Sequence, residues 1–251
     1  MNNLTLEKYL NDYLQSQSFS DYCPNGLQVE GKEEISKVIC GVTASQELLD
    51  LAVREQADAV LVHHGIFWKG DPQGVRGILY HRLKTLLDHN INLYAYHLPL
   101  DAHSECGNNV LLAKIFQVEI SSWCDSDAKY PMVPLGVFQE PVTLGFLRDR
   151  IDLAFNRKSF SVGDLNRRIS KIAWCSGSAS EFLPLAASCG AEVFITGEFP
   201  ERVVHESREL GVSVIAAGHH DTETAGIRRL GEILSQRFPL DCQFVNLANP
   251  L

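Results

Sequence analysis

Apolar and polar residues alternate along the first part of the chain with two different periods. Leucine and tyrosine recur at helical spacing over residues 5–15, which predicts an amphipathic helix. Short apolar runs with the length of buried strands follow at 27–29, 38–42, 59–62 and 91–96. Residues 44–55 and 78–89, which lie between the later runs, show the spacing of apolar residues that is typical of helices. Because strands that alternate with helices form parallel sheets with crossover helices, this pattern predicts an α/β fold.

The second half of the chain repeats this pattern. When residues 35–62 are aligned with 169–196, a shift of 134 positions, eight of the 28 pairs are identical. Roughly two identities would be expected from ordinary residue usage. We therefore predict two similar α/β lobes related by internal duplication, residues 1–125 and 126–251, with no inserted domain between them.

The charge and the cysteine content restrict the class of protein. The chain has 22 Lys and Arg against 31 Asp and Glu, a formal net charge of −9. This disfavours a nucleic-acid partner, because proteins that bind nucleic acid usually carry basic patches. No apolar run approaches the roughly 18 residues that span a bilayer, and the N-terminus lacks the layout of a secretion signal. Seven cysteines without a C-x-x-C pair suit reduced thiols, so we expect a cytoplasmic protein without a membrane partner.

Three histidine-containing segments follow predicted strands. They have the sequences VHHG at 62–65, YHLPLD at 96–101 and GHHDTE at 218–223. Because the carboxyl ends of parallel strands meet at one edge of a sheet, we expect the side chains within each lobe to converge. The last two segments share the pattern His-x-x-x-acid, with one copy in each predicted lobe. These segments therefore predict a metal site between the two lobes.

Imidazole and carboxylate groups are the ligand chemistry that these segments offer. Such ligands suit Zn, Mn, Fe, Co or Ni better than Ca. Up to six or seven donor groups exceed what one tetrahedral ion needs. A pair of ions about 3.5–4 Å apart accounts for the excess, so we expect two divalent metal ions per chain.

Six segments of the chain match the motifs of a known family. They are PNGLQVEG (24–31), GVTAS (41–45), HHGIFWKG (63–70), HLPLDAH (97–103), ITGE (195–198) and AGHHDTE (217–223). The chain resembles the YbgI-type family of GTP cyclohydrolase 1 type 2 homologues, also called NGG-interacting-factor-three-like proteins, from about residue 5 to its C-terminus. The resemblance implies two similar α/β lobes, a dinuclear metal site between them, and toroidal homohexamers built from dimers.

The resemblance also implies which residues bind the metals. Matched position by position, the ligands are His63, His64, Asp101, His219 and Glu223. Glu223 is expected to bridge the two ions. His97 is either a sixth ligand or a residue that orients a ligand.

Three further residues are candidates for catalysis or substrate binding. Glu198 aligns with His64 under the 134-residue shift, and it is either a general base for a water molecule or a structural carboxylate. Trp68 and His103 lie near ligand segments and are candidates to line a substrate pocket. A packing role explains Trp68 equally well.

Two classes of function fit these residues. The first is a dinuclear-metal-dependent hydrolase, in which the metal pair activates a water molecule. The family label suggests that such an enzyme opens the guanine ring of GTP, and phosphoester hydrolysis of a related nucleotide uses the same metal pair. The second is a non-catalytic divalent-metal-binding or scaffold protein that forms a ring.

Overall fold

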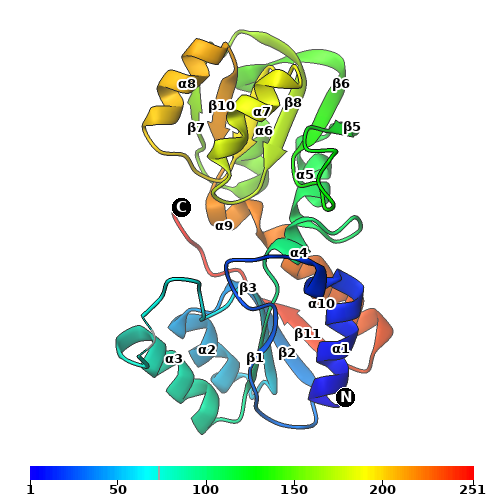
Figure 1. The fold of residues 1–251 in the computed structure, drawn as a ribbon, viewed down its shortest axis with the longest axis vertical. Coiled ribbons are helices and arrows are strands. Elements are labelled where there is room, and N and C mark those ends of the chain that lie inside the picture. The colour runs from blue at the N-terminus through cyan, green and yellow to red at the C-terminus, as the bar shows by residue number, and fades with distance from the viewer. Residues whose placement is uncertain (73) are drawn as a thin grey trace. The chain divides into compact units, whose positions relative to one another are not determined.

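The structure, a computed structural model, describes residues 1–72 and 74–251 (Figure 1). These residues form two compact units. The first unit comprises Met1–Cys106 and Gly226–Ala248, and the second comprises Gly107–Ala225 and Asn249–Leu251. Each unit contains a sheet with helices packed against it, so the predicted α/β class is confirmed.

The sheet of the first unit has the strand order β1-β4-β3-β2-β11. Its strands are β1 (Gly26–Val29), β2 (Lys37–Thr43), β3 (Ala59–His64), β4 (Asn92–Ala95) and β11 (Asp241–Phe244). Strands β11, β2, β3 and β4 pair in parallel, whereas β1 pairs antiparallel to β4. The parallel strands therefore end at the same edge of the sheet, which is the edge where the first two histidine-containing segments begin.

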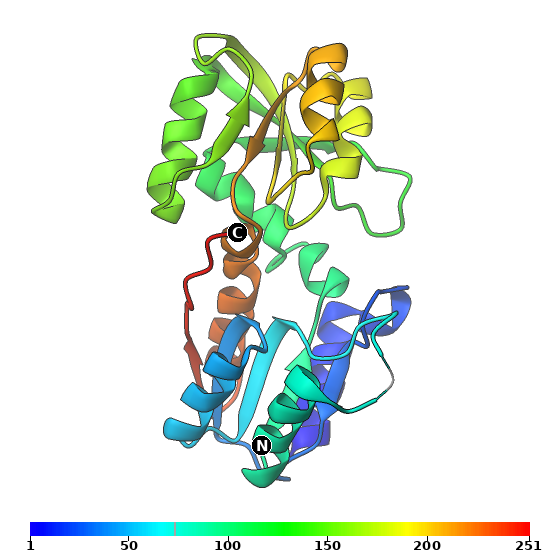
Figure 2. The same ribbon diagram turned by 90° about the vertical axis from the view of Figure 1, so that its left-hand side faces the viewer.

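Helices cover both faces of this sheet. They are α1 (Asn3–Leu14), α2 (Gln46–Arg54), α3 (Gly77–Asp88), the short α4 (Leu98–Asp101) and α10 (Thr224–Arg237), with the 3-10 turn η1 (Ser16–Ser18) after α1. Val38 and Cys40 of β2 pack with α1 and α10, whereas Ile39 packs with α2 and α3, because successive side chains of a strand point to opposite faces. Figure 2 shows α2 and α3 in front of the sheet. Burial on both faces explains why these strands read as continuous apolar runs.

The segment Gly226–Ala248 returns to the first unit, which differs from the predicted division at residue 125. Strand β11 extends the sheet by pairing with β2, and Ile227 and Leu230 of α10 join the core that contains α1. Gly231 permits the close approach of α10, because a Cβ atom there would lie 2.9 Å from Cys40 Sγ. This packing joins residues that are far apart in the sequence, so local patterns do not reveal it.

The sheet of the second unit has the strand order β5-β6-β8-β9-β10-β7. Its strands are β5 (Glu119–Trp123), β6 (Pro134–Thr143), β7 (Phe160–Val162), β8 (Arg168–Cys175), β9 (Val193–Thr196) and β10 (Ser213–Ala216). The central strands β8, β9 and β10 are parallel, whereas β6 is antiparallel to β5 and β8, and β7 is antiparallel to β10. The pattern predicted parallel strands, and β5, β6 and β7 depart from that prediction.

The helices of the second unit pack against its sheet and form two separate hydrophobic cores with it. They are α5 (Asn108–Phe116), α6 (Leu144–Phe155), α7 (Leu183–Ser188), α8 (Arg202–Leu210) and α9 (His219–Thr222), with the 3-10 turn η2 (Ser180–Phe182) before α7. Helices α5 and α6 share a core with Trp174, and α7 and α8 share another with Phe194. Within the ranges that the structure describes, no helix combines the length and the apolar character needed to cross a bilayer.

The strand register in the two units follows the same 134-residue shift as the sequence. Val38 of β2 pairs with Ala59 of β3, and Ile172 of β8 pairs with Val193 of β9. Each member of the second pair lies 134 residues after its counterpart in the first pair.

The carboxylates just before β3 and β9 are also related by the 134-residue shift. The Asp58 carboxylate accepts the backbone N–H groups of Ser36 and Lys37 at 3.0 and 3.1 Å. The Glu192 carboxylate accepts the N–H groups at the two positions 134 residues later, at 2.7 and 3.0 Å. A shared register and a shared side-chain contact together support the predicted duplication.

We expect Asp58→Asn to lower the free energy of unfolding by about 2 kcal/mol at pH 7. Burial by itself raises the pKa of Asp58, but hydrogen bonds from Lys32 and Ser36 and from the backbone more than offset this and lower it to about 2. Because the pKa in the folded protein lies below the ordinary value of 3.8, the ionised carboxylate stabilises the fold above about pH 4. This contribution is lost as the pH falls toward 2.

Urea unfolding of both proteins between pH 7 and pH 2 measures the effect, with exposed Asp12→Asn as the control. The decline in stability toward low pH should be shallower in Asp58→Asn than in the unsubstituted protein. Equal stability of the two proteins at pH 7 would show that the Asp58 contacts do not stabilise the first unit.

Candidate metal centre

Strand β3 ends in two adjacent histidines. His63 is fully buried, and its Nδ1 lies 2.9 Å from the carbonyl oxygen of Tyr96. Because a carbonyl only accepts hydrogen bonds, Nδ1 carries the proton in the neutral ring and Nε2 is the nitrogen that can bind a metal. His64 is half-buried, and its Nδ1 forms a 3.1 Å hydrogen bond with the hydroxyl of Thr43 at the end of β2. The parallel register of β2, β3 and β4 thus holds both rings.

Gly65, which follows these histidines, is required by close packing. A Cβ atom at this position would collide with the side-chain amide of Gln28. That amide oxygen accepts the backbone N–H of Ile66 at 2.9 Å. The contact joins the PNGLQVEG and HHGIFWKG segments and anchors the loop after β3 to β1.

His97 follows β4 and is oriented by a carboxylate that sequence analysis missed. Its Nδ1 lies 2.7 Å from Asp21 Oδ1, and its backbone N–H donates to Asn25 Oδ1 at 2.8 Å. Burial by itself raises the pKa of Asp21, but hydrogen bonds from His97 and Asn25 lower it below its usual value. The ionised carboxylate therefore accepts the Nδ1 proton of His97 and leaves Nε2 as the nitrogen that can act as a ligand.

The three histidine rings lie close together within the first unit. The ring centroids of His63 and His64 are 4.6 Å apart, and His97 lies 5.0 Å from His63 and 5.6 Å from His64. One ring nitrogen from each residue lies within 4.8 Å of the other two. The structure therefore brings together three of the predicted metal-binding residues.

Asp101 joins this group through helix α4. Its backbone N–H donates to the carbonyl of His97 at 3.2 Å, so the His-x-x-x-acid spacing corresponds to one helical turn. The buried Asp101 carboxylate lies 3.5 Å from His63 Nε2. Three imidazoles and a carboxylate form a donor set that fits a divalent transition metal, and we call these four residues the histidine cluster.

The second unit carries the other copy of the His-x-x-x-acid pattern. His219 begins α9, and its Nε2 lies 3.3 Å from the buried Glu223 carboxylate. Its Nδ1 lies 2.9 Å from Glu198, which follows β9. Burial by itself lowers the pKa of His219, but the two carboxylates more than offset this and raise it to about 9. Glu198 therefore contacts the same ring as Glu223, from the opposite nitrogen.

Glycines make room for this arrangement in the second unit. Gly177 has a φ of +67°, and a Cβ atom there would collide with the Glu223 carboxylate. A Cβ atom at Gly197 would lie 2.6 Å from the Cα atom of His219. Substitution at either glycine would therefore displace the predicted ligands His219 and Glu223.

The two predicted substrate-binding residues differ in their surroundings. The Trp68 ring lies 5.7 Å from His64 and meets His97 edge-on at 5.3 Å. His103 donates from Nε2 to the Tyr13 carbonyl at 3.1 Å and accepts backbone N–H groups at Nδ1. Burial lowers the pKa of His103, consistent with a neutral ring. Trp68 thus adjoins the histidine cluster, whereas His103 braces the loop after α4 against α1.

These features define a class of protein, a mixed α/β protein with a candidate divalent-metal site at its strand ends. The model of the family described as Duf34/NIF3 (NGG1p interacting factor 3) matches residues 1–250. The chain belongs to the Duf34/NIF3 family, which confirms the predicted resemblance.

Close relatives cover the whole chain. A Yersinia pestis protein named GTP cyclohydrolase 1 type 2 homolog is 48% identical over 251 residues, with both chains covered in full. An Escherichia coli protein of the same name is 47% identical, again over the full length of both chains. The solved structure of protein ybgI, titled as of unknown function, has a TM-score of 0.95 at 47% identity and 100% coverage of both chains. A crystal structure from Thermus thermophilus has a TM-score of 0.89 at 37% identity, with the same coverage.

We expect Asp21→Asn to weaken divalent-metal binding by about 10- to 100-fold, because the His97 ring loses the acceptor that orients it. Calorimetric titration of the metal-free protein with Zn or Mn measures this change. Asp50→Asn is the matched control, since Asp50 is exposed in the same unit and bonds only Gln46 among the described residues. Unchanged metal affinity in Asp21→Asn would mean that His97 is not held for metal binding by Asp21.

Proposed function

We propose that the protein is a dinuclear-metal-dependent hydrolase that acts on GTP or a related nucleotide. The observation that carries this proposal is the histidine cluster, in which ring nitrogens of His63, His64 and His97 lie within 4.8 Å of one another. Imidazoles with their Nδ1 atoms held by a carbonyl, a hydroxyl and a carboxylate are arranged as in metal sites. A core role alone does not explain three such rings together.

Two divalent ions, drawn from Zn, Mn, Fe, Co or Ni, are the proposed cofactors. The proposed ligands are His63, His64, His97 and Asp101 of the first unit and His219 and Glu223 of the second. The family match and the shared His-x-x-x-acid spacing support a role for both donor sets in holding the same metal pair. When bound, a metal pair of this kind supplies an activated water and stabilises the charge that develops on the attacked atom.

The chain's own residues hold the ligands in the form that binds metal. The Tyr96 carbonyl and the Asp21 carboxylate fix the Nδ1 protons of His63 and His97. Glu198 contacts Nδ1 of His219 in the same way, but the pKa of His219 is raised to about 9, so Nε2 has to lose its proton before it can act as a ligand. This contact favours a positioning role for Glu198, although its carboxylate also remains our candidate for the general base.

A nucleotide substrate is supported by the names of the relatives, which are GTP cyclohydrolase 1 type 2 homologs. Opening of the guanine ring and phosphoester hydrolysis are the two candidate reactions. Trp68 beside the histidine cluster supports an aromatic group in the substrate. His103 remains a substrate-binding proposal from sequence alone. The resemblance further supports a cytoplasmic homohexamer built from dimers.

We expect metal-loaded protein to turn over GTP, another nucleotide or a p-nitrophenyl phosphoester, and we expect His63→Ala and Glu223→Gln to lower turnover by about 100-fold or more. Each change removes a donor atom of a proposed metal ligand. Steady-state assays with each of the five metals measure the effect. The matched control is His89→Ala, because His89 is exposed in the first unit and outside the histidine cluster.

The same assays separate the two roles of Glu198. If Glu198 positions His219, Glu198→Gln weakens metal binding and saturating metal restores much of the activity. If it is the general base, kcat falls at saturating metal. Metal binding without turnover of any substrate would contradict the hydrolase and support a non-catalytic metal-binding protein.

A further inference from the structure

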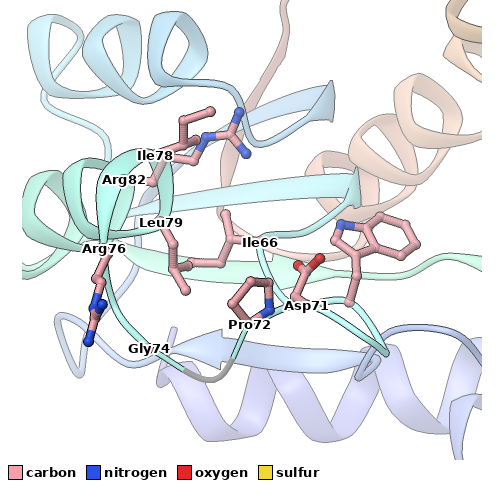
Figure 3. A pocket seen from close by; sticks show the side chains of 9 residues that line it. Ile66, Asp71, Pro72, Gly74, Arg76, Ile78, Leu79 and Arg82 are labelled. Carbon is pink, nitrogen blue, oxygen red and sulfur yellow. The ribbon is translucent and has the colours of Figure 1, made fainter.

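A pocket of about 720 Å³ lies beside the histidine cluster in the first unit (Figure 3). It is lined by described residues of the loop after β3 and by the first half of α3. Ile66, Pro72, Ile78 and Leu79 supply apolar walls. The volume falls within the range of roughly 300–1,000 Å³ that is typical of small-molecule sites. Trp68 lines this pocket and also contacts His64 and His97, so the pocket and the cluster share a wall.

Two arginines bring positive charge to the pocket. Neither Arg76 nor Arg82 forms an ion pair with any residue in the described part of the chain. The Nε atom of Arg82 is buried and has no hydrogen-bond partner within the described residues. A buried N–H donor without an acceptor is costly, so this group is suited to an anion supplied by a ligand. Figure 3 shows the two guanidinium groups apart, on opposite sides of Leu79.

The other end of the pocket offers different chemistry. Trp68 and Asp71 also line the pocket, and the Asp71 carboxylate lies away from both guanidinium groups (Figure 3). A tight turn fixes this pair, since the backbone N–H of Asp71 donates to the Trp68 carbonyl at 3.1 Å. An indole face stacks on a planar base, and a carboxylate accepts hydrogen bonds from its N–H edge. The N–H donors of guanine at N1 and N2 match a carboxylate, whereas adenine presents an acceptor at N1.

We propose that this pocket binds a guanine nucleotide, with the base between Trp68 and Asp71 and the phosphates toward Arg82. Arg76 adds positive charge at the rim. This proposal rests on the proposed function, because it names the site that holds the nucleotide beside the metal ligands. Nucleotide binding in this pocket requires no metal ion, so binding can be tested separately from turnover.

Calorimetric titration of the full-length, metal-free protein with GTP, ATP, guanosine and tripolyphosphate tests the proposal. We expect GTP to bind most tightly, because only GTP engages both ends of the pocket. Arg82→Met keeps the apolar stem and removes the charge, and it should weaken GTP binding by about 10- to 100-fold. Asp71→Asn should reduce the preference for GTP over ATP. Arg54→Ala is the matched control, because Arg54 is exposed in the same unit and does not line the pocket.

Several outcomes would overturn the proposal. One is that GTP binds folded Arg82→Met as tightly as the unsubstituted protein, and another is that GTP fails to bind the metal-free protein at millimolar concentration. Equal affinity for tripolyphosphate and GTP would reduce the pocket to an anion site and exclude the base. The two proposals fail separately. Arg82-dependent binding of GTP in a protein that shows no turnover with any metal would retain the pocket and remove the hydrolase.

Discussion

The orientation of imidazole rings at the ends of parallel strands is the constraint on which the candidate site depends. Strands β3 and β4 pair in register, and the backbone N–H of Tyr96 donates to the Val62 carbonyl at 3.0 Å. This pairing leaves the Tyr96 carbonyl beside His63 and carries His97 to the neighbouring position. The rings then need only fixed acceptors at Nδ1 to present Nε2 to a common point. Strand pairing thus supplies the geometry, and hydrogen bonds select the tautomer.

The two units use the same sheet chemistry but different supporting groups. Val38 with Ala59 and Ile172 with Val193 occupy equivalent registers, and Asp58 and Glu192 accept backbone N–H groups at equivalent positions, those of Ser36 and Ser170. At the strand ends the units diverge. The first unit gathers three histidines, whereas the second places one histidine between two carboxylates, which raise its pKa to about 9. The repeated scaffold thus presents dissimilar donor groups in the two units.

Much of this arrangement is predictable from local sequence, and the remainder depends on long-range contacts. Apolar runs and helical spacing locate β2, β3, β4 and α1–α3, because each buries its own apolar face. The return of α10 and β11 and the antiparallel strand β6 are not predictable in this way, since they depend on packing between distant segments. Among the site residues, the His-x-x-x-acid spacing indicates His97 and Asp101. Asp21 gives no such signal, because its contact spans 76 residues and the adjoining PNG segment reads only as a turn.

The number of divalent ions that each chain binds tests the central claim most directly. Metal-free protein is equilibrated with Mn or Zn, freed of excess metal, and analysed by elemental mass spectrometry for ions per chain. The account predicts two ions per chain, and fewer in the combined variant His63→Ala/His219→Ala. Protein that holds no ion, or a metal content that the combined variant leaves unchanged, would contradict it.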